Sequence, residues 1–171
     1  GYAFYRNWIS VYHRMGYDFV RIGGGLAFPG KTKAADDTAA LSKGQRRWVE
    51  EGTGPIASWE DFEKYPWPKV ETMDFSMVEF VAKNLPEGMG LFLCPSSGFL
   101  EIPLDTLLGY ENMCYLLADN PDLVAAVVQR VGELISAYNR NLLGLPRLCG
   151  FFQGDDMGFK TGTLISPADM R

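Results

Sequence analysis

The chain has 171 residues, of which 47% are apolar and 22% are charged, and its 16 basic and 21 acidic side chains give a net charge of −5. This composition excludes disordered and collagen-like chains, because enough apolar residues are present to form a core. The acidic balance, with no basic run longer than Arg46-Arg47, argues against a nucleic acid or an anionic membrane as partner. No apolar run approaches the ~20 residues that span a bilayer, and residues 2–7 do not resemble a signal peptide, so we expect a soluble, cytoplasmic protein.

The cysteines and the histidine give no sign of a metal site. Cys94, Cys114 and Cys149 are odd in number and far apart, which is typical of free thiols rather than of a disulfide framework or a zinc motif. His13 is the only histidine, and it lies beside the apolar stripe of its predicted helix. We therefore expect no metal and no cofactor to be bound by these residues alone.

The first elements are a helix and a short strand. Apolar residues recur at helical spacing from Phe4 to Met15, and Gly16 follows as a stop signal. Residues 18–22 predict a β-strand that runs into three glycines, 23–25. These glycines do not complete the dinucleotide fingerprint G-x-G-x-x-G, and we interpret them as a tight turn.

The next part of the chain mixes loops and short helices. Residues 31–55 are polar and lack a sustained period, which predicts a long loop with a hairpin near 47–51. Ser58 and Asp61 are spaced as a capping box for a brief helix. Asp74 is placed to cap a second helix that ends before Gly88.

The second half predicts two further strands and two helices. Residues 91–94 and 148–152 are short apolar runs bounded by turn residues, and both predict strands. A helical region is expected from 104 to 118, and the clearest helix follows from 121 to 142. Helices that alternate with three short strands indicate an α/β protein with parallel strands joined by crossover helices.

The length of the chain bears on the architecture. A complete (β/α)₈ barrel, or TIM barrel, needs about 250 residues, so three strands would supply less than half of one. The chain begins with Gly1 rather than Met, and residues 166–171 read as a helix start that is not continued. We therefore expect residues 1–171 to be the N-terminal part of a single barrel domain, truncated at the C-terminus and also at the N-terminus.

Polar residues gather where the predicted strands end, and this is where α/β proteins bind their ligands. We predict Arg21, Ser97 and Gln153 as substrate-binding residues and Asp155 and Asp156 as catalytic carboxylates. Adjacent residues of an extended chain point to opposite sides, so we expect one of the two aspartates to face a pocket and the other to cap a turn.

The segment from Gly150 to Arg171, with Gln-Gly-Asp-Asp-Met-Gly followed by Leu-Ile-Ser-Pro, resembles the uroporphyrinogen decarboxylase superfamily. Further pieces agree in order, namely 16–18, 54–62 and 117–121. The resemblance implies a (β/α)₈ barrel with a pocket at the carboxyl ends of its strands. Only Asp155 and Asp156, with Met157 and Gly158, map onto the family's strand-end acidic motif.

Three functions follow from this resemblance. The first is a decarboxylase-like lyase of porphyrin biosynthesis, although the family's arginine-rich N-terminal motif has no counterpart here. The second is a cobalamin-dependent methyltransferase that moves a methyl group from a corrinoid to a thiol, for which zinc and a corrinoid would be cofactors of the full-length protein. The third is a non-catalytic relative. The expected partner is accordingly a small-molecule tetrapyrrole or a methylated corrinoid protein, and a homodimer is left open.

Overall fold

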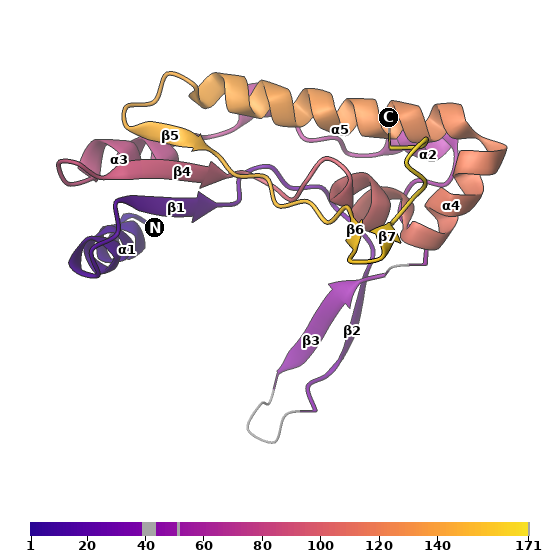
Figure 1. Ribbon diagram of the computed structural model, residues 1–171, viewed down its shortest axis with the longest axis horizontal. Coiled ribbons are helices and arrows are strands. Elements are labelled where there is room, and N and C mark those ends of the chain that lie inside the picture. Colours follow the sequence, from indigo (N-terminus) through magenta and orange to yellow (C-terminus); the bar gives the residue numbers. More distant parts are fainter. Residues whose placement is uncertain (39–43, 51, 171) are drawn as a thin grey trace. The chain divides into compact units, whose positions relative to one another are not determined.

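A computed structural model describes residues 1–38, 44–50 and 52–170 and has a mixed α/β fold (Figure 1). The chain divides into two compact units, and it passes between them several times. Unit 1 contains residues 1–27, 68–97 and 133–154, and unit 2 contains residues 28–67, 98–132 and 155–171. Among the described residues, no helix is both long enough and apolar enough to cross a membrane.

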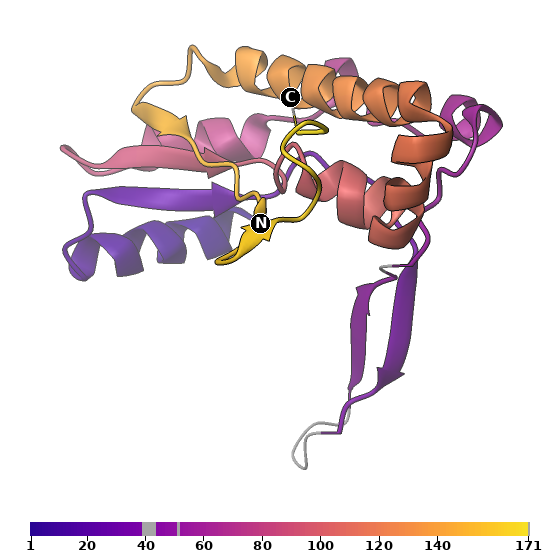
Figure 2. The same cartoon turned by 45° about the vertical axis from the view of Figure 1, so that its right-hand side comes forward.

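A three-stranded parallel sheet forms the centre of unit 1. Its strands are β1 (Phe19–Gly23), β4 (Gly90–Cys94) and β5 (Leu148–Phe151), in the order β1-β4-β5. Both pairings of β4 are parallel, and Figure 2 shows the three strands side by side. The three predicted strands and their parallel direction are therefore confirmed.

The two faces of this sheet differ in burial. On one face Val20, Ile22, Leu91 and Leu93 are each at most 5% exposed. On the other face the β1 side chains are exposed, including Phe19 at 39%. We call this second side the open face of the sheet.

The helices of unit 1 are α1 (Tyr2–Arg14), the short η1 (Val70–Thr72), α3 (Ser76–Asn84) and the last part of α5 (Pro121–Leu142). The first helix is confirmed, but Met15 at the end of its apolar stripe is 67% exposed. The aromatic side chains of α1 instead pack along the helix against one another, as Trp8 does with Phe4 and Tyr12. Trp8 also ties α1 to β1, since its indole N–H donates to Arg21 O at 3.2 Å.

Unit 2 holds the remaining elements. Its strands form two antiparallel hairpins, β2 (Thr32–Asp36) with β3 (Gln45–Val49) and the short β6 (Gly158–Phe159) with β7 (Gly162–Thr163). Its helices are α2 (Trp59–Lys64), the π-helical η2 (Ile102–Leu108), α4 (Tyr110–Asp119) and the first part of α5. The hairpin expected near 47–51 thus exists, but it begins earlier, and residue 51 lies outside the described residues.

The helical region predicted over 104–118 is divided at Gly109. This glycine has φ +79°, a backbone conformation that ends η2 before α4 begins. The carbonyls at the end of η2 are used by the segment around Gly54, because Gly54 N–H donates to Leu108 O at 2.7 Å and Ile56 N–H to Leu107 O at 3.0 Å. Because the helix ends at Gly109, the carbonyls of Leu107 and Leu108 are available to the segment around Gly54. The local sequence pattern does not predict these long-range hydrogen bonds.

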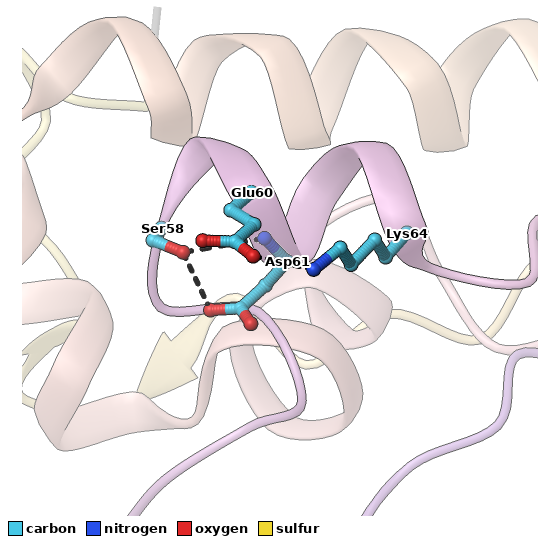
Figure 3. Close-up of polar contacts among 4 residues, drawn as sticks. All are labelled: Ser58, Glu60, Asp61 and Lys64. Atoms are coloured by element: carbon cyan, nitrogen blue, oxygen red, sulfur yellow. Dashed lines mark hydrogen bonds and ion pairs between the residues drawn. The ribbon is translucent and has the colours of Figure 1, made fainter.

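The predicted capping box at α2 is confirmed (Figure 3). Asp61 N–H donates to Ser58 Oγ at 3.2 Å, and the Ser58 hydroxyl donates to Asp61 Oδ2 at 2.8 Å. Asp61 Oδ2 also accepts from Ala57 N–H at 3.1 Å. The Ser58 hydroxyl and then the Ala57 N–H hold the pKa of Asp61 below its usual value.

We expect Gly54→Ala to destabilise the protein by roughly 1–3 kcal/mol, because the added Cβ would overlap backbone that cannot move aside. That atom would lie only 1.9 Å from Leu107 O. Gly52→Ala is the matched control, since its nearest neighbour would be Glu111 Oε2 at 3.8 Å. Urea unfolding measures the stability of both variants. Equal unfolding midpoints would contradict the close approach of Gly54 to Leu107.

We expect the stabilisation by Asp61 to be present at neutral pH and to be lost as the pH falls through its lowered pKa. A carboxyl whose pKa is lower in the folded than in the unfolded state stabilises the fold only while it is ionised. Asp61→Asn should therefore reduce the free energy of unfolding at neutral pH, and its effect should shrink as acid protonates the Asp61 carboxyl of the wild type. Glu63→Gln removes the same charge from the same helix as a control, and a pH-independent Asp61→Asn effect would contradict the assignment.

Candidate functional site

The carboxyl ends of the unit 1 strands remain paired beyond the strands themselves. On the β1 side, Gly24 N–H donates to Cys94 O at 2.9 Å. On the β5 side, Phe152 N–H donates to Leu93 O at 2.7 Å, and an isolated parallel bridge joins Ser97 to Gly154. Backbone hydrogen bonds therefore hold the segments after β1 and β5 to the segment after β4.

Ser97 and Gln153, both predicted to bind substrate, lie together at these ends. With its amide group oriented to satisfy its neighbours, Gln153 donates to Ser96 O at 3.1 Å and to Ser97 O at 3.2 Å. The Ser96 hydroxyl donates to Ser97 O at 2.9 Å. The amide of Gln153 thus bridges the segments after β4 and β5, and we call these three residues the strand-end cluster.

Arg21, the third predicted binding residue, lies on the open face rather than at a strand tip. The parallel register pairs Arg21 with Phe92 and Gly23 with Cys94, so these residues share one face. Burial raises the pKa of the Cys94 thiol, and the positive charge of Arg21 offsets part of that rise. Arg21 therefore places a cation on the face where the Phe19 and Phe92 rings meet at 4.9 Å between centroids.

Of the three glycines, Gly23 is the last residue of β1, and the chain bends at Gly25 instead of forming the expected tight turn. Gly24 and Gly25 have φ values of +84° and +122°. A Cβ on Gly25 would lie 2.3 Å from the hydroxyl oxygen of Tyr138, so only glycine fits at this contact.

Asp155, predicted as catalytic, binds backbone N–H groups of unit 2. Its Oδ1 accepts from Glu101 N–H at 2.8 Å, and its Oδ2 accepts from Leu100 N–H at 3.0 Å. These N–H groups lie just before η2, where helices leave donors without partners of their own. A Cβ on Gly98 would lie 2.0 Å from the Asp155 carboxyl carbon, so the carboxylate is packed against the chain there. Asp155 accordingly holds the start of η2 in place.

Asp156 lies at a hollow in unit 2. The hollow has a volume of about 300 Å³, and we call it the acidic hollow because three carboxylates line it; its lining residues are Glu101, Leu104, Asp105, Tyr110, Asp156, Phe159 and Leu164. No lysine, arginine or histidine occurs among these described residues. Asp156 itself is exposed and accepts from Gly158 N–H at 3.3 Å. The two aspartates do not divide as expected, because Asp156 both lines the hollow and accepts from the N–H two residues further on, while Asp155 binds the distant N–H groups before η2. The catalytic role of the pair stays a prediction.

Glu101, Asp105 and Tyr110 line this hollow, and none of them was predicted as a site residue from the sequence. Asp105 follows Glu101 by four residues at the edge of a predicted helix, a spacing that places both on one face. No sequence pattern points to Tyr110. Its hydroxyl donates to Leu164 O at 3.0 Å, and the two residues are 54 positions apart in the sequence.

Metal binding finds no support in the described part of the chain. No group of three or more His, Cys, Asp or Glu side chains there has the geometry to hold an ion. The cysteines are free, with Cys94 partly buried and Cys114 and Cys149 exposed.

Comparison with known proteins adds no identification, because no family model, no curated protein and no solved structure matches the chain.

We expect Asp155→Ala to destabilise the protein by about 1–3 kcal/mol, since it leaves two backbone N–H groups without their acceptor. Asp156→Ala is the adjacent control, and it should change the free energy of unfolding by no more than about 0.5 kcal/mol because the side chain is exposed. Thermal and urea unfolding of both variants measure this difference. Equal effects would show that Asp155 does not anchor η2.

Proposed function

We propose that the chain belongs to a uroporphyrinogen decarboxylase-like protein and that its parallel sheet is part of a (β/α)₈ barrel. The observation that carries this proposal is the strand-end cluster, in which polar groups after β4 and β5 are held together by Gln153. The sheet adds support, because one face is buried while the other presents aromatic side chains and Arg21. In a barrel, such a face is turned inward and its carboxyl end forms the ligand pocket.

The proposed ligand is a tetrapyrrole, and the proposed reaction is decarboxylation of its acidic side chains in the cytoplasm. In this reaction the bond to the carboxylate carbon breaks, CO₂ leaves, and a proton takes its place. Arg21 provides a cation that can pair with a substrate carboxylate. Ser97 and Gln153 provide hydrogen-bonding groups that fix the ligand's orientation. Asp155 and Asp156, both in unit 2, are the carboxyl groups proposed for catalysis.

The acidic hollow favours a second candidate, corrinoid-linked methyl transfer to a thiol. Glu101 and Asp156 each bring a carboxylate to this hollow, and carboxylates repel a ligand that carries many carboxylates of its own. A corrinoid carries amide side chains, whose N–H groups donate to carboxylates. The resident zinc of such an enzyme has no ligand set among the described residues, so no step of the reaction is derived through zinc.

Ligand titration followed by tryptophan fluorescence distinguishes these candidates. Uroporphyrin is the carboxylate-rich probe and aquacobalamin is the amide-rich probe. For the decarboxylase-like function we expect uroporphyrin to bind and Arg21→Gln to weaken it by roughly tenfold or more, as expected for a charged hydrogen bond. Arg14→Gln is the control, because Arg14 is an exposed residue of α1 in the same unit.

Each other outcome has a defined meaning. Binding of aquacobalamin but not of uroporphyrin, weakened by Asp156→Asn, would replace decarboxylation by methyl transfer. Binding of uroporphyrin with no CO₂ release from uroporphyrinogen under anaerobic conditions would leave a non-catalytic binding protein. If neither probe binds, or if Arg21→Gln and Arg14→Gln behave alike towards uroporphyrin, the proposed site is wrong.

A further inference from the structure

The β2–β3 hairpin of unit 2 is a regular element without a covering layer. All five residues of β2 are exposed, as are four of the five residues of β3, including Trp48 at 48%. The two strands form a sheet of their own, and no other described strand pairs with either outer edge. A two-stranded ribbon is only marginally stable in water, and an unpaired strand edge is a template for another strand.

The hydrogen bonds of the hairpin determine which backbone groups of β2 face outward. Glu50 N–H donates to Lys31 O at 3.0 Å, and Asp37 N–H donates to Gly44 O at 3.0 Å. In an antiparallel pair, such hydrogen-bonded positions alternate along the strand. Residues 31, 33, 35 and 37 therefore bond to β3, while Thr32, Ala34 and Asp36 direct their N–H and C=O groups to the outer edge.

The charges along β2 are complementary to the same strand running in the opposite direction. The sequence reads Lys31-Thr-Lys-Ala-Ala-Asp-Asp37, with cations at one end, carboxylates at the other and alanines in the middle. Only the outward residues can form hydrogen-bonded pairs, so an antiparallel pairing can be centred on Ala34. That register sets Lys31 opposite Asp37 of the second copy and Thr32 opposite its Asp36. Cross-strand pairs of opposite charge stabilise a sheet.

The outer edge of β3 lacks this property. Its central residues are Arg46 and Arg47, so antiparallel pairing of two β3 edges about Arg47 would set arginine against arginine. Like charges directly opposite each other destabilise the pairing. The two edges of one hairpin therefore differ, and only the β2 edge is self-complementary.

We propose that two copies of this chain associate through their β2 edges, which join the two hairpins into one four-stranded antiparallel sheet. The contact is isologous, since each β2 strand offers the same edge to the other. This contact covers the outer edge of β2. The register of the two strands is set by the pairs between Lys31 of one copy and Asp37 of the other, one pair at each end of the contact.

Sedimentation velocity of the purified protein tests the proposal, and we expect a dimer that weakens at high salt. Lys31→Asp should raise the dimer dissociation constant by roughly tenfold, because it sets like charges opposite each other at two symmetric positions. The double variant Lys31→Asp with Asp37→Lys restores the complementarity and should restore the dimer. Arg47→Asp makes the same change of charge on the other edge, and it should leave the dimer intact.

A second experiment reports the register directly. Hydrogen-bonded residues opposite each other have Cα atoms about 5.5 Å apart, a separation that suits a disulfide. Ala34→Cys should therefore cross-link two copies under mild oxidation, in a background of Cys114→Ser and Cys149→Ser that removes the exposed thiols. Ala35→Cys is the control and should cross-link much more slowly, because its counterpart is offset along the strand.

A monomeric wild-type protein would overturn the proposal. So would a dimer that Lys31→Asp does not weaken, or equal cross-linking of Ala34→Cys and Ala35→Cys, since the copies would then meet through another surface.

Discussion

Parallel backbone pairing on both sides of β4 is the constraint on which unit 1 depends. β4 is the only strand bonded to two others in this sheet, and its pairing continues past its end to the Ser97–Gly154 bridge. This continuation fixes the polar segments after β4 and β5 relative to each other. It also leaves the buried face to apolar side chains and the open face to Arg21 and the aromatic residues, so the same hydrogen bonds set both the core and the candidate binding surface.

Unit 2 shows the same dependence on contacts between distant segments. Asp155 supplies acceptors to N–H groups at the start of η2, and Gly54 uses the carbonyls at its end. Both ends of η2 are thus satisfied by residues that lie far from it in sequence. Glu101 and Asp105, which belong to this region, then line the acidic hollow with Asp156. Asp155 thus holds the backbone next to residues that line the hollow, while its catalytic role stays a prediction.

The proposals for function and for self-association rest on different surfaces. The proposed decarboxylase-like function is argued from the strand-end cluster and Arg21 of unit 1, whereas the proposed association depends on the outer edge of β2. A chain that binds no tetrapyrrole can still pair through that edge, and a monomer can still bind a ligand. The two proposals can therefore be tested independently of each other.

The sequence by itself determined the elements whose signals are local. The three apolar strands, the long helix of α5 and the Ser58–Asp61 cap follow from periodicity and from hydrogen bonds within a few residues. The clustering of Ser97 with Gln153 was expected because parallel strands bring their carboxyl ends to one edge. Only the tertiary structure decided that Asp155 binds backbone before η2, that Gly109 divides a helical region, and that Tyr110 joins the hollow. Each of these depends on hydrogen bonds or close contacts between segments tens of residues apart, and no local pattern of residues encodes such a contact.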